Sequence, residues 1–120
     1  MIEYFYNIVS MEGDRSHFSA RIELTPDNPI YAAHFPGHPV TPGACQLEMV
    51  RSVASLAVGR DLEIASVKNL KFLSAVNPLE TGTVLIEGEM DGEDSGPLRC
   101  SASIAGDETV FTKLSMTFRQ

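Results

Sequence analysis

The sequence predicts an α+β fold in which a curved antiparallel β-sheet wraps around one long central α-helix. Three observations support this prediction: several segments alternate apolar and polar residues, short turns join the later ones, and one long segment is apolar on every side. A chain of 120 residues, 43% of them hydrophobic, is long enough to bury a core without disulfides or metal. We therefore expect residues 1–120 to form a single domain.

The alternation is clearest in residues His17–Leu24, where apolar residues take every second position. This pattern is typical of a half-buried strand, and it turns the side chain of His17 toward solvent. Similar extended segments predict five further strands at Ile2–Ser10, Leu62–Phe72, Thr83–Met90, Leu98–Ala105 and Val110–Arg119. Turn signals such as Asn77-Pro78, Asp91-Gly92 and Ala105-Gly106-Asp107 separate the last four, and such short connections favour antiparallel neighbours.

The segment Thr41–Gly59 predicts the helix. Thr41 is a suitable N-cap, Pro42 suits the first helical position, and Gly59 suits the end. Between Ala44 and Val58 the apolar residues fall on all sides of the helix. A helix of that kind is normally buried, so we expect the sheet to surround it.

Charge and composition exclude several classes of function. Nine basic against sixteen acidic residues give a net charge of −7, which argues against binding to nucleic acid. The N-terminal residues lack the pattern of a secretory signal, and no segment resembles a membrane span. The two cysteines, Cys45 and Cys100, suggest neither a disulfide framework nor a zinc site. We expect a cytoplasmic protein.

Glu48 is a lone acid in the second turn of the apolar helix, where a carboxylate is costly unless it is paired or has a task. Arg51 lies three residues further on, so one interpretation is an i,i+3 ion pair. The other interpretation is a catalytic acid, since buried ionisable groups also mark active sites. The two residues alone leave both interpretations open.

The loop before the helix adds a histidine. It reads HFPGHPVTPG from His34, and its prolines restrict the backbone while its glycines permit close approach. His34 can therefore be held near the helix start, where Gly43 lies in the first turn and has an N–H free to bind an oxyanion. An imidazole, a carboxyl group and such a donor together suit proton abstraction beside a carbonyl.

These residues have a familiar spacing. His34-Phe35-Pro36-Gly37, Pro39, Pro42-Gly43 and Glu48 resemble the hot-dog-fold 3-hydroxyacyl-[acyl-carrier-protein] dehydratases of the FabZ and FabA type. The resemblance implies a hot-dog fold and a homodimer or higher homo-oligomer, in which the histidine of one subunit faces the carboxylate of the other. Two positions depart from the family pattern: Ala33 replaces a glycine and Ser52 replaces a polar amide residue.

The resemblance also implies roles. His34 would remove the α-proton of a 3-hydroxyacyl thioester, and the Gly43 N–H would polarise the thioester carbonyl. Glu48 would donate a proton to the leaving hydroxyl or orient the water formed, giving a trans-2-enoyl thioester. Further substrate-binding positions are Pro42, Phe35 and Gly37.

The substrate would be carried on the phosphopantetheine of acyl carrier protein or of coenzyme A, with no further cofactor and no metal. An acidic carrier would dock on basic residues at the entrance of the site, and the candidates are Arg51, Lys68 and Lys71.

Other functions remain open. In a hot-dog thioesterase Glu48 would activate water, although a histidine before a rigid loop favours elimination. A non-catalytic acyl-binding or partner subunit is the more distant alternative. A metal site of His34, His38 and Glu48 is not favoured because no fourth ligand is evident. Cys45, near the helix start, is interpreted as a packing residue rather than a nucleophile.

Overall fold

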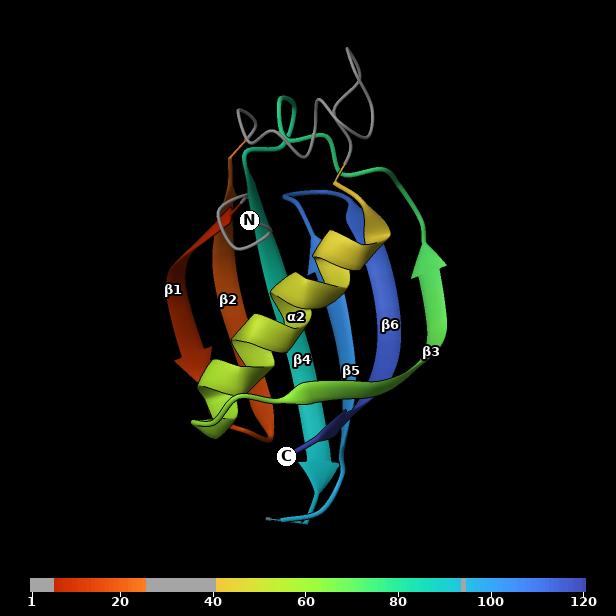
Figure 1. Cartoon of the computed structure of the whole chain (residues 1–120). Helices are drawn as coiled ribbons and strands as arrows, with labels where there is room; N and C mark the ends of the chain where they lie inside the picture. Colours follow the sequence, from red (N-terminus) through yellow and green to blue (C-terminus); the bar gives the residue numbers. More distant parts are fainter. Residues whose placement is uncertain (1–5, 26–40, 94) are drawn as a thin grey trace.

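Within the residues that the structure describes, a curved six-stranded antiparallel sheet packs against one helix (Figure 1). The structure is a computed structural model that describes residues 6–25, 41–93 and 95–120. Its elements are β1 (Tyr6–Gly13), β2 (His17–Leu24), α2 (Gly43–Val58), β3 (Glu63–Phe72), β4 (Thr83–Gly92), β5 (Leu98–Ala105) and β6 (Val110–Arg119). The strand order is β1-β2-β4-β5-β6-β3, and every neighbouring pair is antiparallel.

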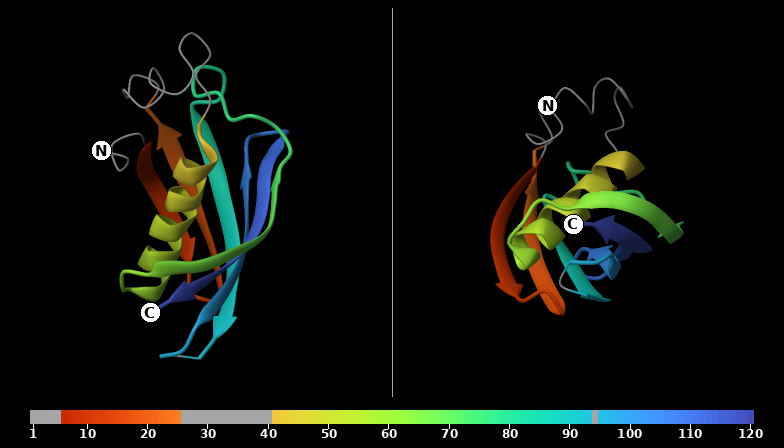
Figure 2. Two further views of the ribbon diagram at one scale, coloured as in Figure 1. Left: turned by 45° about the vertical axis from the view of Figure 1, so that its right-hand side comes forward. Right: turned by 60° about the horizontal axis from the view of Figure 1, so that its bottom comes forward.

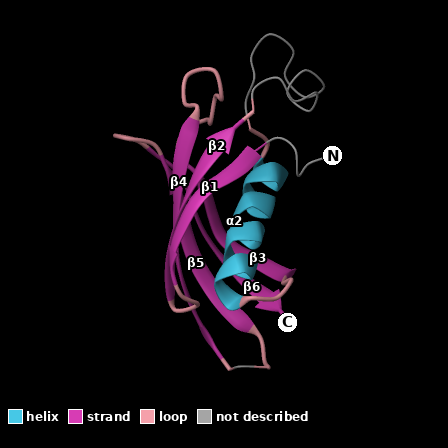
Figure 3. Cartoon of the chain, turned by 90° about the vertical axis from the view of Figure 1, so that its left-hand side faces the viewer, coloured by secondary structure: helices cyan, strands magenta, loops and turns pink. Residues whose placement is uncertain are grey.

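The sheet curls around α2, which lies along its concave face (Figures 2 and 3). β3 starts beside the C-terminal end of the helix and sweeps across to pair with β6 at the sheet edge (Figure 1). These observations confirm the predicted fold class. In β2 the residues at even positions are buried and His17 is exposed, with 61% of its side chain accessible, as the alternation predicts.

The ends of some strands differ from the prediction. β1 continues to Gly13 rather than stopping at Ser10, and β4 continues through Asp91 and Gly92, which were expected to form a turn. Gly92 has φ of 141°, a conformation that favours glycine, and both residues pair with β5. The turn follows β4 instead, where the Gly96 N–H donates to the Glu93 carbonyl.

The helix begins one residue later than the sequence predicts. Pro42 is the N-cap, with φ −60° and ψ 151°, and α2 begins at Gly43, so the expected Thr41 cap and helical Pro42 are wrong. Thr41 is instead held by the loop before β4, because its N–H donates to the Val76 carbonyl at 2.7 Å. The C-terminal prediction is confirmed, since Gly59 caps the helix with φ 85°.

Burial of the helix is also less complete than expected. One face packs on the sheet, while Leu56 is 57% exposed and Leu47 is half-buried, so the prediction of burial on every side is wrong. The sheet is open between its edges and covers only part of the helix circumference, which leaves one side of α2 accessible. The buried face consists of Cys45, Gln46, Met49, Val50, Val53 and Ala54.

The core between sheet and helix is built from the inward residues of the strands. Phe18 is fully buried and faces Gly88 across the β2–β4 pair. A Cβ on Gly88 would lie 2.5 Å from the Phe18 Cζ, so glycine leaves room for the ring. Among the described residues, every buried side-chain nitrogen and oxygen has a hydrogen-bond partner.

Both edges of the sheet are irregular. In β1 the pairing with β2 shifts between Ile8 and Ser10. In β3 the pairing with β6 shifts twice, and Asn69, inside the second shift, has φ of 53°. Asparagine tolerates this left-handed conformation better than most residues.

Candidate active site

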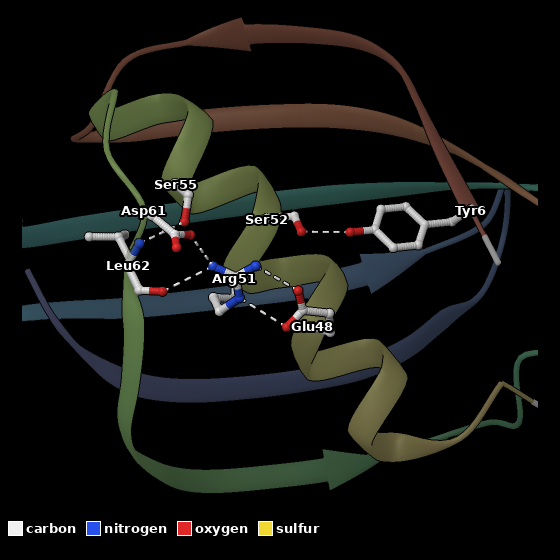
Figure 4. Close-up of polar contacts among 7 residues, drawn as sticks. All are labelled: Tyr6, Glu48, Arg51, Ser52, Ser55, Asp61 and Leu62. Carbon is white, nitrogen blue, oxygen red and sulfur yellow. Dashed lines mark hydrogen bonds and ion pairs between the residues drawn. The ribbon is translucent and has the colours of Figure 1, made fainter. Parts of the chain in front are cut away.

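Glu48 lies in the second turn of α2, on the accessible side of the helix (Figure 4). Its carboxylate accepts two hydrogen bonds from Arg51, from Nη2 to Oε1 at 2.6 Å and from Nε to Oε2 at 2.9 Å. The two side chains are 31% and 23% exposed. The predicted i,i+3 ion pair is therefore confirmed, in a bidentate geometry that only a guanidinium provides.

Arg51 also holds the turn between α2 and β3. Its Nη1 donates to Asp61 Oδ1 at 2.7 Å and to the Leu62 carbonyl at 3.0 Å (Figure 4). The Leu62 N–H donates in turn to the Ser55 hydroxyl at 3.1 Å. The hydrogen bond to Glu48 raises the pKa of Arg51 above its ordinary value against the opposing effect of burial, and Asp61 adds to the rise. All three guanidinium nitrogens are thus engaged within the chain, and carrier docking by Arg51 would compete with these bonds.

A second polar contact joins α2 to β1. The hydroxyls of Tyr6 and Ser52 share a hydrogen bond of 2.6 Å (Figure 4). Ser52 is one of the two positions at which the sequence departs from the dehydratase pattern, and Tyr6 is a hydrogen-bond partner for it that the sequence did not reveal. An open groove of about 650 Å³ runs beside this contact between β1 and the C-terminal half of α2, and Arg51 and Arg60 are among its lining residues.

The start of the helix forms a second cavity, of about 380 Å³. Gly43 is the first helical residue, so helix geometry leaves its N–H without an intrahelical partner. A Cβ on Gly43 would lie 2.7 Å from the Phe72 Cζ, so the glycine permits this half-exposed ring to pack against the helix start. The cavity is lined by Thr41, Pro42, Gly43, Gln46, Phe72, Leu73, Ser74 and Ala75.

A buried amide anchors this helix start. The Gln46 Nε2 donates to the Thr41 carbonyl at 3.0 Å, and the Thr112 hydroxyl of β6 donates to Gln46 Oε1. Gln46 and Thr112 are both buried. The position of Gly43 is therefore fixed from β6, a contact between residues 66 positions apart that the sequence analysis did not find.

The structure does not bring Gly43 and Glu48 of one chain into a common cavity. They are five positions apart in the sequence, a rise of about 7.5 Å along the helix axis. Arg51 draws the Glu48 carboxylate toward the C-terminal half of α2, away from the helix start. The cavity at Gly43 and the groove at Arg51 have no lining residue in common. His34, Phe35 and Gly37 lie outside the described residues.

The two lysines predicted to contact a carrier lie on β3, and both are exposed. Lys71 directly precedes Phe72, which contacts the helix start, and its strand pairing places it opposite Lys113 of β6. Lys113 is exposed as well, so that Lys68, Lys71 and Lys113 together form a basic row. Sequence reasoning missed it because only the pairing of β3 with β6 brings it next to Lys71.

Neither cysteine has the features of a nucleophile. Burial, with a smaller contribution from nearby Glu48, raises the pKa of Cys45, and burial raises the pKa of Cys100 to about 12. These directions agree with the interpretation of Cys45 as a packing residue. Within the described ranges, no three His, Cys, Asp or Glu side chains are grouped so as to hold a metal ion, and no helix has both the length and the apolar character needed to cross a membrane.

Comparison with known proteins identifies relatives over most of the chain. A family model described as ApeI-like, ApeI dehydratase, matches residues 10–110. The 3-hydroxyacyl-[acyl-carrier-protein] dehydratase FabZ of Thermus thermophilus is 29% identical over 119 residues, covering 91% of this chain and 82% of the relative. FabZ of Levilactobacillus brevis is 26% identical over 102 residues, covering 79% and 68%. The dehydratase resemblance is confirmed.

Solved structures show the same fold. The dehydratase heterocomplex ApeI:P from Xenorhabdus doucetiae aligns with a TM-score of 0.73 at 19% identity, covering 95% of this chain and 97% of the other. A hypothetical thioesterase with coenzyme A from Streptococcus pneumoniae aligns with a TM-score of 0.68 at 17% identity, covering 98% and 88%. At these identities the match supports the hot-dog architecture alone.

Proposed function

The chain belongs to the ApeI-like dehydratase family, and on this basis we propose that it removes water from a 3-hydroxyacyl thioester to give the trans-2-enoyl thioester. The observation that carries the proposal is the placement of Glu48, the acid of the dehydratase motif, on the accessible side of α2 with its carboxylate held by Arg51. The relatives named as dehydratases support the same reaction class. The role belongs to fatty-acid-type biosynthesis in the cytoplasm.

The chemistry follows from the residues of the motif. His34 takes the proton from C2, and the electron pair of that C–H bond forms the C2–C3 double bond as the C3–O bond breaks. The Gly43 N–H and the positive end of the α2 dipole stabilise the negative charge on the thioester oxygen, for which one donor contributes about 10²–10³ in rate. Glu48 donates a proton to the leaving hydroxyl or orients the water. Each proton-transfer group contributes about 10²–10⁴.

We propose that two copies of the chain complete the site. Within one copy the cavity at Gly43 does not have Glu48 among its lining residues, and the Glu48 carboxylate is bound to Arg51. A homodimer solves this separation, because His34 and Gly43 of one copy can then face Glu48 of its partner. The Xenorhabdus relative is a heterocomplex, so a different hot-dog subunit is the alternative partner. The mass of the purified protein in solution distinguishes a dimer from a monomer that requires another subunit.

The acyl group is carried on phosphopantetheine, and we propose acyl carrier protein as the carrier, with coenzyme A as the alternative. The basic row of Lys68, Lys71 and Lys113 is suited to an acidic carrier, and it ends beside Phe72 at the helix start. The enzyme needs no further cofactor for this elimination.

The test is to incubate the protein with a 3-hydroxyacyl thioester and to follow enoyl absorbance and free thiol together. Enoyl without thiol supports dehydration. Thiol release identifies a thioesterase, and neither signal identifies a binding subunit. His34→Ala should abolish turnover and Glu48→Gln should reduce it by about 10²–10⁴, whereas His17→Ala, which removes an exposed histidine on β2, should have no effect. Wild-type rates in both site variants would contradict the assignment.

A further inference from the structure

Building on the proposed dehydration, we propose that Arg51 is a positioning residue that fixes Glu48 as a hydrogen-bond acceptor. Glu48 then orients the leaving hydroxyl and does not protonate it. The inference chooses between the two roles that the dehydratase motif leaves open for this acid, and it assigns Arg51 a function in the site itself.

The geometry of the ion pair carries the first step. A guanidinium has donors only, so both oxygens of Glu48 accept hydrogen bonds from Arg51. Protonation would turn one of these oxygens into a hydroxyl, which is a poorer acceptor for the guanidinium. Each carboxylate oxygen keeps a second lone pair, and the side chain is 31% exposed. A substrate hydroxyl can therefore donate to Glu48 while the ion pair stays intact.

Arg51 is itself immobilised, which is what a positioning residue requires. Its Nη1 donates both to the Leu62 carbonyl and to the Asp61 carboxylate. The Asp61 side chain is 89% exposed, so water screens this contact and it contributes little. The Leu62 carbonyl is the stronger anchor, because Leu62 is buried and its N–H is also bound, by Ser55.

The proton balance closes without a second acid. His34 takes the C2 proton, and the C2–H electron pair becomes the second bond between C2 and C3. The C3–O electron pair leaves with the hydroxyl, which accepts the same proton from the His34 imidazolium and departs as water. The imidazole returns to its neutral form, and Glu48 keeps the hydroxyl in place throughout.

A kinetic double-mutant cycle tests this coupling, with 3-hydroxybutyryl-CoA as substrate. The variant Arg51→Met should have a kcat lower by about 10–100-fold, because its Glu48 is no longer held in position. Its KM should change little. In the Glu48→Ala background the same substitution should change kcat less than about twofold, because the acceptor that Arg51 positions is gone. A merely structural role predicts an equal loss in both backgrounds, and that result would overturn the proposal.

Two further variants refine the test. Arg51→Lys keeps the positive charge but loses the two parallel N–H donors of the guanidinium. Its kcat should therefore lie between those of Arg51→Met and the wild type. Full recovery would show that bidentate positioning is unnecessary. Arg60→Met removes a cation that follows the C-cap of α2 and lines the same groove as Arg51, and it should leave kcat unchanged. If Arg51→Met does not fold, as judged by circular dichroism, Arg51→Lys provides the same comparison in both backgrounds.

A readout independent of turnover separates this inference from the proposed function. The ¹³C carboxyl signal of Glu48, assigned by its loss in Glu48→Gln, should move in Arg51→Met but not in Arg60→Met. A Glu48 signal that is the same in Arg51→Met and in the wild type overturns the inference whatever the activity. The wild-type protein could show the expected Glu48 signal and yet form no enoyl product. That result overturns the proposed function and the kinetic role of Arg51, but it leaves the contact between Arg51 and Glu48 in place.

Discussion

Replacing Thr112 by valine should destabilise the fold through a single buried hydrogen bond. The Thr112 hydroxyl donates to Gln46 Oε1, and both side chains are almost completely inaccessible to solvent. Valine has nearly the same shape, so no cavity forms, but Gln46 Oε1 is left buried without a donor. Such a group costs about 1–3 kcal/mol. With an unfolding entropy of about 2 cal/mol/K per residue, a chain of 120 residues should lose about 4–12 °C in Tm.

Urea unfolding followed by far-UV circular dichroism suits this measurement, because the chain has no tryptophan. The partly exposed Thr117 of the same strand gives the control, and Thr117→Val should change the free energy of unfolding by less than about 0.5 kcal/mol. The double variant Thr112→Val with Gln46→Met removes both partners, so its loss should be smaller than the sum of the single losses. Thr112→Val with wild-type stability, or strictly additive losses, would refute the reasoning.

Three further results are expected. Gly88→Ala should lower the free energy of unfolding by about 1–3 kcal/mol, measured by urea titration, because the new methyl group would lie 2.5 Å from the buried Phe18 ring. Burial raises the pKa of Cys100 to about 12, so its thiol should stay protonated and resist alkylation up to pH 9 in the folded protein, and fast labelling without urea would contradict this. Lys71→Glu and Lys113→Glu should each raise KM for an acyl-carrier-protein substrate up to about fivefold and leave KM for a neutral N-acetylcysteamine thioester unchanged; equal effects on both substrates would exclude docking by charge.

Much of the fold could be predicted because its signals are local. The alternation in β2 is visible in eight consecutive residues, and the end of α2 at Gly59 depends on one glycine. The start of α2 was predicted wrongly because Thr41 has the right side chain for a cap, whereas its backbone is bound by Val76, 35 positions later in the sequence. A cap prediction from composition has no access to that contact.

The candidate site shows the same division. The Glu48–Arg51 pair follows from helix periodicity and was predicted as one of two interpretations. The contacts of Arg51 with Asp61 and Leu62 depend on how the turn folds back after Gly59, which no pattern in the sequence encodes. The exposure of one side of α2 was also missed, because an exposed apolar face of a helix has the same amino-acid composition as a buried one.

The irregular edges of the sheet bear on how the protein behaves at high concentration. A long, even strand at an edge is a template for endless addition of further chains, which is the route to fibrils. Here β1 is interrupted after Ile8, and β3 is interrupted on both sides of Val67. An incoming strand would find its backbone ladder out of phase after a few residues. The interruptions therefore disfavour open-ended polymerisation. A concentrated solution of this protein should remain clear under conditions in which a protein with regular edge strands would form a gel.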